Sequence, residues 1–317
     1  QQVHVPVFKN IAGCEVVAFA ASSLEKGARI AAACGIARGY GDWRELLAIE
    51  KPDLIAIATP PAVQFEIAKV ALAHKTALLC EKPLAMNAAQ TAELMRLGEH
   101  IPAVVDFEFP ENPAFIRCRD VIQSRALGEP RSMKVRWSLQ TYANREGLDS
   151  WKTKTAEGGG ALNAFGSHVF YYLEWLFGPI QEMDLNVGGS RPGFDTLVEG
   201  ELTFASGLGG RLLIDTNNPE SPGHSVEIVC ENGVLSLENF DKDHLLGFTL
   251  KQTSQGQEQT LVPAWKSAGD GRILAVQPLA ARLVSWVRTG VGCHPDLSAG
   301  HRVQQWIDAS LRAGLKR

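Results

Sequence analysis

The sequence predicts an α/β protein with a parallel sheet in its first third and a large, mostly antiparallel sheet in the remainder. The first hundred residues alternate short apolar runs with amphipathic stretches, the pattern of a parallel sheet covered by helices on both faces. From residue 182 to 262, strand-like segments are separated by Gly, Asn, Pro and Asp, which is typical of an antiparallel sheet with one exposed face. We therefore expect a parallel α/β domain over residues 1–110 and an α+β domain over residues 111–317.

The first domain is expected to contain four buried strands joined by helices. The runs at 54–58 and 77–80 are short and almost wholly apolar, as in strands that are buried on both faces. Ser23 and Asp42 precede helical stretches and can cap them. The expected strands are 14–20, 54–58, 77–80 and 103–107, and the expected helices are 3–11, 24–34, 43–49, 64–74 and 87–99.

The second domain is expected to mix helices with half-buried strands. Residues 131–139 (RSMKVRWSL) alternate apolar and polar side chains, and Asn232–Gly233 is a hairpin signal. Pro278 and Gly290 bound a helix over 278–289, with Pro at its start and Gly just past its end. Further helices are expected at 112–126, 160–176 and 299–313.

Composition excludes several classes of protein. The chain has 317 residues, a net charge of −4 with both signs dispersed, and no apolar run that approaches a membrane span of about 18 residues. We expect neither nucleic acid nor membrane as a partner. The six cysteines form no Cys-x-x-Cys motif, which favours a reducing, cytoplasmic setting. Cys293–His294 is an adjacent pair without metal-ligand spacing, so no metal site is expected.

The loops after the parallel strands are the expected site, because open sheets of this kind bind ligands at the carboxyl ends of their strands. Ala21 stands where a cofactor-binding sheet often has an acid, so Ser22, Ser23 and Lys26 are candidates for holding a 2′-phosphate. A simple helix cap at Ser23 is the alternative.

Two further strand ends carry candidate residues. Thr59-Pro60-Pro61 stiffens a turn so that backbone can approach a flat ligand, although a plain strand terminator has the same sequence. Lys82, held by the proline that follows it, is a positioned cation that can polarise a substrate oxygen.

A glycine run in the second domain leads to a histidine. Residues 157–168 read EGGGALNAFGSH. The run lacks the ending of a phosphate loop, and Gly166-Ser167-His168 lacks the nucleophile elbow of a serine hydrolase. We expect the glycines to let backbone approach a ligand and His168 to be an acid or base, with a purely structural histidine as the alternative.

These motifs together resemble the Gfo/Idh/MocA oxidoreductase family over nearly the whole chain. The resemblance rests on VVAFAASS, IAIATPPAVQFEIAKVALAHKTALLCEKPLA, NPAF…ALGEPRSMKVRW, GGGALNAFGSHVF and PDLSAGHRVQQWIDAS. It implies an N-terminal Rossmann-type domain, a C-terminal substrate-binding domain whose open sheet commonly forms a dimer interface, and NAD(P)-dependent redox chemistry on sugars, inositols and their derivatives. A homo-oligomer, dimer or tetramer, is therefore expected.

The resemblance also implies roles for individual residues. Lys82 matches the catalytic lysine, which also contacts the cofactor, and His168 matches the usual proton acceptor, which also contacts the substrate. The implied cofactor contacts are Thr59, Pro60, Pro61 and Glu81, and the implied substrate contacts are Glu108, Trp151 and Lys152, with specificity around Tyr142, Asn144 and Arg145.

Four positions depart from the family's pattern. Many members carry an acid four residues before the histidine, and this chain has Ala164 there. Tyr171 replaces a common Asp, and Gln64 replaces a common His. Ala21 replaces the acid usual after the second strand, which mildly favours NADP over NAD.

The start of the chain departs further. The family opens with a strand and a Gly-x-Gly-x-x-Gly loop, and this sequence starts inside the helix that follows them. Because that strand lies in the middle of the sheet and the loop cradles the pyrophosphate, we expect residues upstream of Gln1 in the natural protein.

The leading hypothesis is an NAD(P)-dependent dehydrogenase or reductase that acts on a sugar, polyol or related hydroxy or keto compound. A non-catalytic dinucleotide- or sugar-binding regulator of the same fold is the main alternative, favoured by Ala164 and Ala21. An NAD-dependent glycosidase or lyase is a third, which no residue selects.

Overall fold

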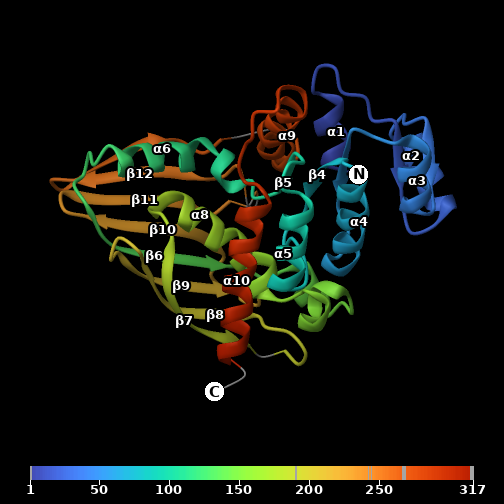
Figure 1. The fold of residues 1–317 in the computed structure, drawn as a ribbon. Coiled ribbons are helices and arrows are strands. Elements are labelled where there is room, and N and C mark those ends of the chain that lie inside the picture. The colour runs from blue at the N-terminus through green and yellow to red at the C-terminus, as the bar shows by residue number, and fades with distance from the viewer. Residues whose placement is uncertain (1, 190, 242, 244, 266–268, 315–317) are drawn as a thin grey trace. The chain divides into compact units, whose positions relative to one another are not determined.

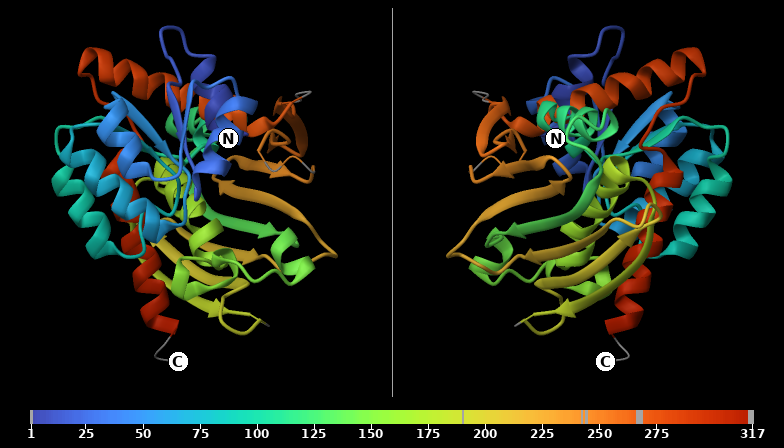
Figure 2. Two further views of the ribbon diagram at one scale, coloured as in Figure 1. Left: turned by 90° about the vertical axis from the view of Figure 1, so that its right-hand side faces the viewer. Right: turned by 90° about the vertical axis from the view of Figure 1, so that its left-hand side faces the viewer.

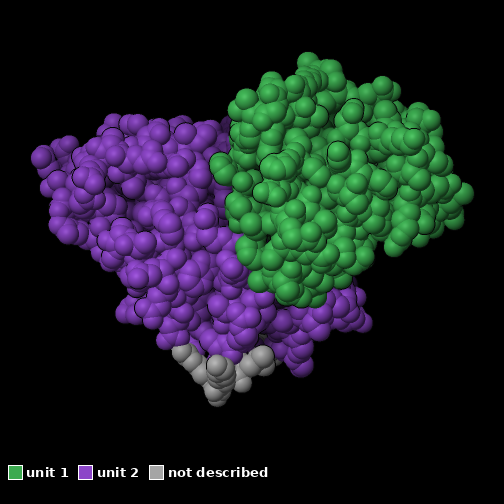
Figure 3. Space-filling model, viewed as in Figure 1, with its two compact units in different colours: residues 1–106, 272–301 green, residues 107–271, 302–317 purple. Residues whose placement is uncertain are grey.

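The computed structural model describes residues 2–189, 191–241, 243, 245–265 and 269–314 (Figure 1). The chain divides into two compact units, coloured separately in Figure 3. Unit 1 comprises residues 1–106 and 272–301, and unit 2 comprises residues 107–271 and 302–317. The first boundary lies near the expected change of pattern at residue 110, and the segment 272–301 is grouped with the N-terminal part. No helix among the described residues is long and apolar enough to cross a membrane.

Unit 1 contains five parallel strands in two groups. β1 and β2 pair with each other, and β3, β4 and β5 form a three-stranded sheet in that order. The opening strand of a Rossmann sheet lies between the strands that correspond to β1 and β3, and the described residues hold no strand there. The strands are β1 Ala18–Ala20, β2 Arg38–Tyr40, β3 Leu54–Ile57, β4 Ala77–Cys80 and β5 Ala103–Val105.

Burial differs among these strands according to their position. Every residue of β4 and β5 is buried, as their apolar sequences predict. In β1 and β3, however, only Ile57 is buried. The prediction that all four apolar runs are buried strands is therefore wrong for these two, because each has an edge without a strand neighbour in the described chain. The outer edge of β5, by contrast, is covered by the chain at Pro295 and Asp296.

Helices cover the strands of unit 1. Ser23, Asp42 and Asn87 cap α2, α3 and α5 through their side chains, which confirms the caps expected at Ser23 and Asp42. Val7 and Phe8 pack with Leu79, Val104 and residues of α9 in one apolar core. The helices are α1 His4–Lys9, α2 Leu24–Ala33, α3 Trp43–Glu50, α4 Pro61–Ala73, α5 Ala88–Leu97 and α9 Gly271–Thr289.

Helix α9 corrects one sequence-based expectation. Pro278 was expected at its first position, but the helix begins at Gly271 and encloses the proline. Ala275, Val276 and Leu279 on both sides of Pro278 are buried in the core. Burial of this apolar face outweighs the backbone hydrogen bond that a helical proline removes.

Unit 2 is built on one eight-stranded twisted sheet with the order β13-β12-β11-β10-β6-β9-β8-β7 (Figure 2). Only β6 and β9 are parallel; the other neighbours are antiparallel. Buried and exposed residues alternate along β10, so one face is packed and the other open. The strands are β6 Pro130–Ser138, β7 Ile180–Gly188, β8 Leu197–Phe204, β9 Gly209–Asp215, β10 Gly223–Cys230, β11 Gly233–Asn239, β12 Thr249–Ser254 and β13 Gln257–Val262.

His168, the histidine predicted from sequence, lies in the first turn of α8 in unit 2. A π-helix, η4 Leu162–Gly166, leads directly into α8 Ser167–Phe177. The segment expected as one helix over 160–176 therefore contains a wider turn. The remaining elements are the 3₁₀ helices η1 Phe109–Glu111, η2 Trp151–Thr153 and η3 Thr155–Glu157, and the α-helices α6 Pro113–Gln123, α7 Tyr142–Glu146 and α10 Leu297–Gly314, whose first residues belong to unit 1.

Candidate active site

The strand register of unit 1 brings the predicted residues to one edge of its sheet. Ile57 is level with Cys80, and Cys80 is level with Val105. The residues that follow these three therefore emerge side by side at the carboxyl edge. This edge holds the predicted residues Thr59, Glu81 and Lys82, together with Asp106.

Gln64 holds the segment that carries Lys82. Its side chain is completely buried. Its Nε2 lies 2.6 Å from the carbonyl oxygen of Glu81 and 3.1 Å from those of Pro83 and Leu84, and its Oε1 accepts a hydrogen bond from the Glu81 backbone N–H at 2.9 Å. This clamp explains the glutamine that sequence comparison noted only as a departure.

A buried histidine with two carboxylates adjoins the same segment. His4 Nε2 lies 3.3 Å from Asp106 Oδ2 and 3.6 Å from Glu81 Oε1. Burial lowers the pKa of His4, but the hydrogen bond to Asp106 and the charges of both carboxylates outweigh it, so that the pKa is raised above its ordinary value. Burial, helped by the charge of Asp106, also raises the pKa of Glu81. The cluster therefore favours the protonated forms of His4 and Glu81.

The ligand atoms of His4, Glu81 and Asp106 lie within 4.8 Å of one another. One imidazole and two carboxylates are also a donor set for a divalent cation. A cation there would compete with a proton for His4 Nε2. Sequence reasoning missed His4 because nothing in QQVHVPVFKN signals its partners.

Thr59 is the cofactor-contact candidate that the structure supports best. Its Oγ1 is buried and has no hydrogen-bond partner within the described chain, a state that usually marks a contact with water or a ligand. Pro60 and Pro61 form the N-cap and first position of α4, so they begin a helix as well as end a strand. A buried hydroxyl without a partner at the carboxyl edge fits a dinucleotide.

The residues after β1 show a capping contact at Ser23. Ser22, Ser23 and Lys26 are all exposed. Ser23 Oγ accepts a hydrogen bond from the Lys26 backbone N–H at 3.3 Å. Ser23 thus serves as a helix cap, and the 2′-phosphate role stays a prediction for this group.

In unit 2, His168 is enclosed by three consecutive residues. The His168 side chain is 5% exposed, and its Nδ1 lies 3.7 Å from Glu108 Oε2. The rings of Phe107 and Phe109 meet the imidazole edge to face, with centroids 6.2 and 5.0 Å away. Tyr171, one turn along the helix, stacks on Phe107 at 4.5 Å. These contacts fix the plane of the imidazole.

Gly159 and Gly160 of the glycine run lie against protein atoms within unit 2. The sequence had suggested an approach to a ligand instead. A Cβ on Gly160, which has φ +96°, would lie 2.0 Å from Asp195 Oδ1, and one on Gly159 would lie 2.3 Å from the Trp151 carbonyl oxygen. Asp195 is buried and accepts a hydrogen bond from the Leu162 backbone N–H at 2.7 Å. The glycines let Asp195 and the chain at Trp151 hold the start of the helix, so the close approach that the structure shows is to protein. An approach of this backbone to a ligand stays a prediction.

Other predicted substrate residues take varied positions in unit 2. Trp151 and Lys152 lie in η2, and the Lys152 carbonyl oxygen accepts a hydrogen bond from the Gly160 N–H. Asn144 is buried and donates to the Thr216 carbonyl oxygen at 2.7 Å, which gives it a structural task. Tyr142 is 63% exposed.

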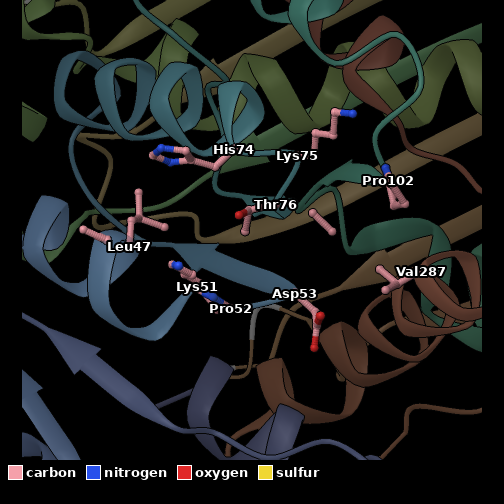
Figure 4. Close-up of a pocket in the computed structure, with 11 residues that line it drawn as sticks. Leu47, Lys51, Pro52, Asp53, His74, Lys75, Thr76, Pro102 and Val287 are labelled. Atoms are coloured by element: carbon pink, nitrogen blue, oxygen red, sulfur yellow. The ribbon is translucent and has the colours of Figure 1, made fainter.

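A pocket in unit 1 lies away from these residues. It has a volume of about 660 Å³ and opens at the amino ends of β3 and β4, among Leu47, Asp53, His74, Thr76 and Pro102 (Figure 4). Lys82 follows the opposite ends of those strands, so this pocket is not the strand-end site.

Known proteins match both parts of the chain. Residues 1–107 match the oxidoreductase family with an NAD-binding Rossmann fold, and residues 115–236 match the GFO/IDH/MocA C-terminal domain. An uncharacterized oxidoreductase of Synechocystis sp. is 30% identical over 338 residues, covering 99% of this chain and 91% of that protein. The chain belongs to the GFO/IDH/MocA oxidoreductase family.

Further GFO/IDH/MocA likenesses cover the full length of the chain. Inositol 2-dehydrogenase 2 of Paenarthrobacter aurescens is 24% identical over 322 residues, covering 98% of this chain and 90% of that protein. The structure of levoglucosan dehydrogenase in complex with NADH has a TM-score of 0.85 at 21% identity, covering 98% and 91% of the two chains. These matches confirm the family resemblance and the predicted fold class.

Proposed function

We propose that this GFO/IDH/MocA protein is a dehydrogenase or reductase that transfers a hydride between NAD(P) and a sugar, polyol or related hydroxy or keto compound. The observation that carries the proposal is the Gln64 clamp, which fixes the Glu81–Lys82 segment at the carboxyl edge of the parallel strands. A lysine held this firmly suits electrostatic stabilisation of a developing alkoxide. Relatives named for inositol and levoglucosan support the substrate class.

The residues have distinct roles in the proposed reaction. Thr59, Pro60, Pro61 and Glu81 would hold the cofactor, which would supply the hydride-transfer chemistry when bound. His168 takes the proton from the substrate hydroxyl as the carbon loses its hydride, and Lys82 stabilises the negative charge on that oxygen. The C–H and O–H bonds break and a carbonyl forms; in reduction His168 returns the proton.

We propose a mild preference for NADP. Ala21 would leave the cofactor ribose without the acid that repels a 2′-phosphate, and the exposed Ser22 and Lys26 follow Ala21 in the chain. Comparison of kcat/KM for the two cofactors tests this, together with Ala21→Asp, which should shift the ratio towards NAD.

The activity is tested by cofactor absorbance over a panel of sugars and polyols. Lys82→Ala should abolish most turnover, whereas Lys69→Ala, which removes a surface ion pair with Glu93, should leave it intact. Unchanged turnover in Lys82→Ala would refute the assignment. Cofactor binding without turnover on any substrate would instead favour the non-catalytic regulator, and release of a leaving group without net cofactor change would favour the glycosidase or lyase.

We also propose that the open face of the eight-stranded sheet forms a homo-oligomer interface. The exposed Val229 lies on this face, among alternating outward residues of β10. Light scattering should report a dimer or tetramer, and Val229→Lys should shift it towards the monomer. A monomeric wild-type protein would contradict the proposal.

A further inference from the structure

His168, to which the proposed function assigns proton transfer, has the carboxylate of Glu108 beside it. This acid does not come from the helix segment before His168, where the family's pattern places one. The sequence lacks an acid at Ala164, four residues before His168. In the structure, Glu108 Oε2 lies 3.7 Å from His168 Nδ1. Both side chains are largely buried, at 16% and 5% exposure. A buried carboxylate at this distance interacts strongly with an imidazole because little water screens it.

We propose that Glu108 is the positioning acid of His168 and does the task that an acid at position 164 would otherwise do. The inference rests on the proposed function, in which His168 accepts the proton. Glu108 favours a proton on Nδ1, the ring nitrogen nearest to it, which leaves the Nε2 lone pair as the acceptor. It also stabilises the imidazolium that forms when Nε2 takes the substrate proton.

The residues around the imidazole support a role for Nδ1 in the contact with Glu108 and for Nε2 in proton transfer. Phe107 and Phe109 flank Glu108 in the chain and meet the ring at interplanar angles of 76° and 81°. The short segment 107–109 thus supplies both the walls that fix the ring plane and the carboxylate that fixes its tautomer. A distance of 3.7 Å is longer than a hydrogen bond, and such contacts often shorten in a substrate complex.

The helix geometry explains why the acid does not need to come from position 164. Residues 162–166 form a π-helix, in which the Ser167 backbone N–H bonds to the Leu162 carbonyl oxygen five residues earlier. The wider turn changes the angle between the side chains at Ala164 and His168 from that of a regular α-helix. An acid on a separate element can still meet Nδ1.

The first test measures the ring itself and needs no turnover. Nitrogen-15 NMR of the wild-type protein, with the His168 signal assigned by its loss in His168→Asn, should show the neutral ring protonated at Nδ1. Glu108→Gln should lose this single tautomer. A neutral wild-type ring protonated at Nε2, or an unchanged signal in Glu108→Gln, would overturn the proposal.

The second test measures catalysis. Glu108→Gln should lower kcat about 100-fold with a smaller change in KM. Glu108→Asp should recover part of this loss because it keeps the charge. Glu99→Gln, the same change at an exposed acid after α5, is the control and should match wild type. If the wild-type enzyme turns over and Glu108→Gln keeps the same kcat and pH profile, the role of Glu108 is refuted but the proposed function is not. If the wild-type protein gives the expected NMR signal but no turnover, the proposed function is refuted but the contact between Glu108 and His168 is not.

Discussion

Each unit of this protein contains a buried histidine beside carboxylates, and the two clusters differ in how many charges surround the ring. His4 in unit 1 lies between Asp106 and Glu81, and its pKa is raised. His168 in unit 2 has Glu108 on one side and aromatic edges from Phe107 and Phe109. Two carboxylates favour the protonated form of the His4 ring, whereas the single carboxylate beside His168 can orient a ring that is proposed to gain and lose its proton in each cycle. The difference separates a histidine that supports structure from one suited to catalysis.

The largest expected effect tests this separation directly. His168→Asn should lower kcat by about 10²- to 10⁴-fold, because it removes the proton acceptor. His4→Asn should cost about tenfold or less, since His4 acts only through the segment that carries Lys82. Steady-state kinetics on a responsive polyol measures both. Equal losses of kcat in the two variants would contradict the assignment of a catalytic role to His168 and a structural role to His4.

The next largest effect is expected on the free energy of unfolding when the Gln64 clamp in unit 1 is removed. Gln64→Leu leaves the Glu81 N–H and the carbonyls of Pro83 and Leu84 buried without their side-chain partner. We expect a loss of about 3 kcal/mol in the free energy of unfolding. Urea denaturation measures it, and Gln90→Leu, at a partly exposed glutamine of α5, is the comparison. A loss below about 1 kcal/mol would show that the clamp is dispensable.

The support beneath the unit 2 cluster allows a parallel test. Gly160→Ala places a methyl group against Asp195 at a backbone angle that only glycine adopts readily. The expected destabilisation is on the order of 2–3 kcal/mol, with a displaced His168 and reduced kcat. Gly147→Ala has a similar positive φ and open space, so it isolates the backbone cost from the steric one. Equal losses in both variants would show that contact with Asp195 adds nothing.

The pH dependence of stability should distinguish the charged cluster. Since the pKa of His4 is raised on folding, its contribution is complete below the unfolded value of 6.5 and is lost as pH rises through the folded value. The raised pKa of Glu81 has the same sign, beginning near its ordinary value of 4.5. Denaturation at a series of pH values should show wild-type stability falling above pH 6.5. His4→Asn should flatten that decline, and an equally steep decline in the variant would contradict the assignment.

The smallest expected effect concerns Ser23, which lies in neither cluster. Ser23→Ala removes the cap of α2 and should cost about 1 kcal/mol. If the hydroxyl only caps the helix, the KM for NADPH stays at the wild-type value. A rise in KM for NADPH without one for NADH would assign Ser23 to the 2′-phosphate.

The sequence was most informative where local pattern and burial agree. The apolar runs at 54–58 and 77–80 predicted β3 and β4 to within a residue. β2 was missed because three residues, with Arg38 exposed, form no recognisable pattern and depend on pairing with β1. Pro278 misled the prediction because the core packing of α9 is a tertiary effect.

The places of the candidate residues could be predicted from the sequence, but their contacts could not. Lys82, Thr59 and His168 stand at strand ends or follow a glycine run, which sequence spacing reveals. His4 and Asp106 are separated by 102 residues, and neither has a local signal that names the other. The contact between Gly160 and Asp195 was likewise missed, since the fold alone brings them together.

The π-helical turn before α8 has a consequence for natural and engineered variation. A π-turn contains one residue more than the α-turn that would replace it. Deleting a single residue between 162 and 166 would therefore let this turn close as an α-turn while the residues after it keep their places. His168 would stay beside Glu108, although the chain had become one residue shorter. We expect a single deletion to be tolerated better in this segment than within α8, where it would rotate the rest of the helix by about 100° around its axis.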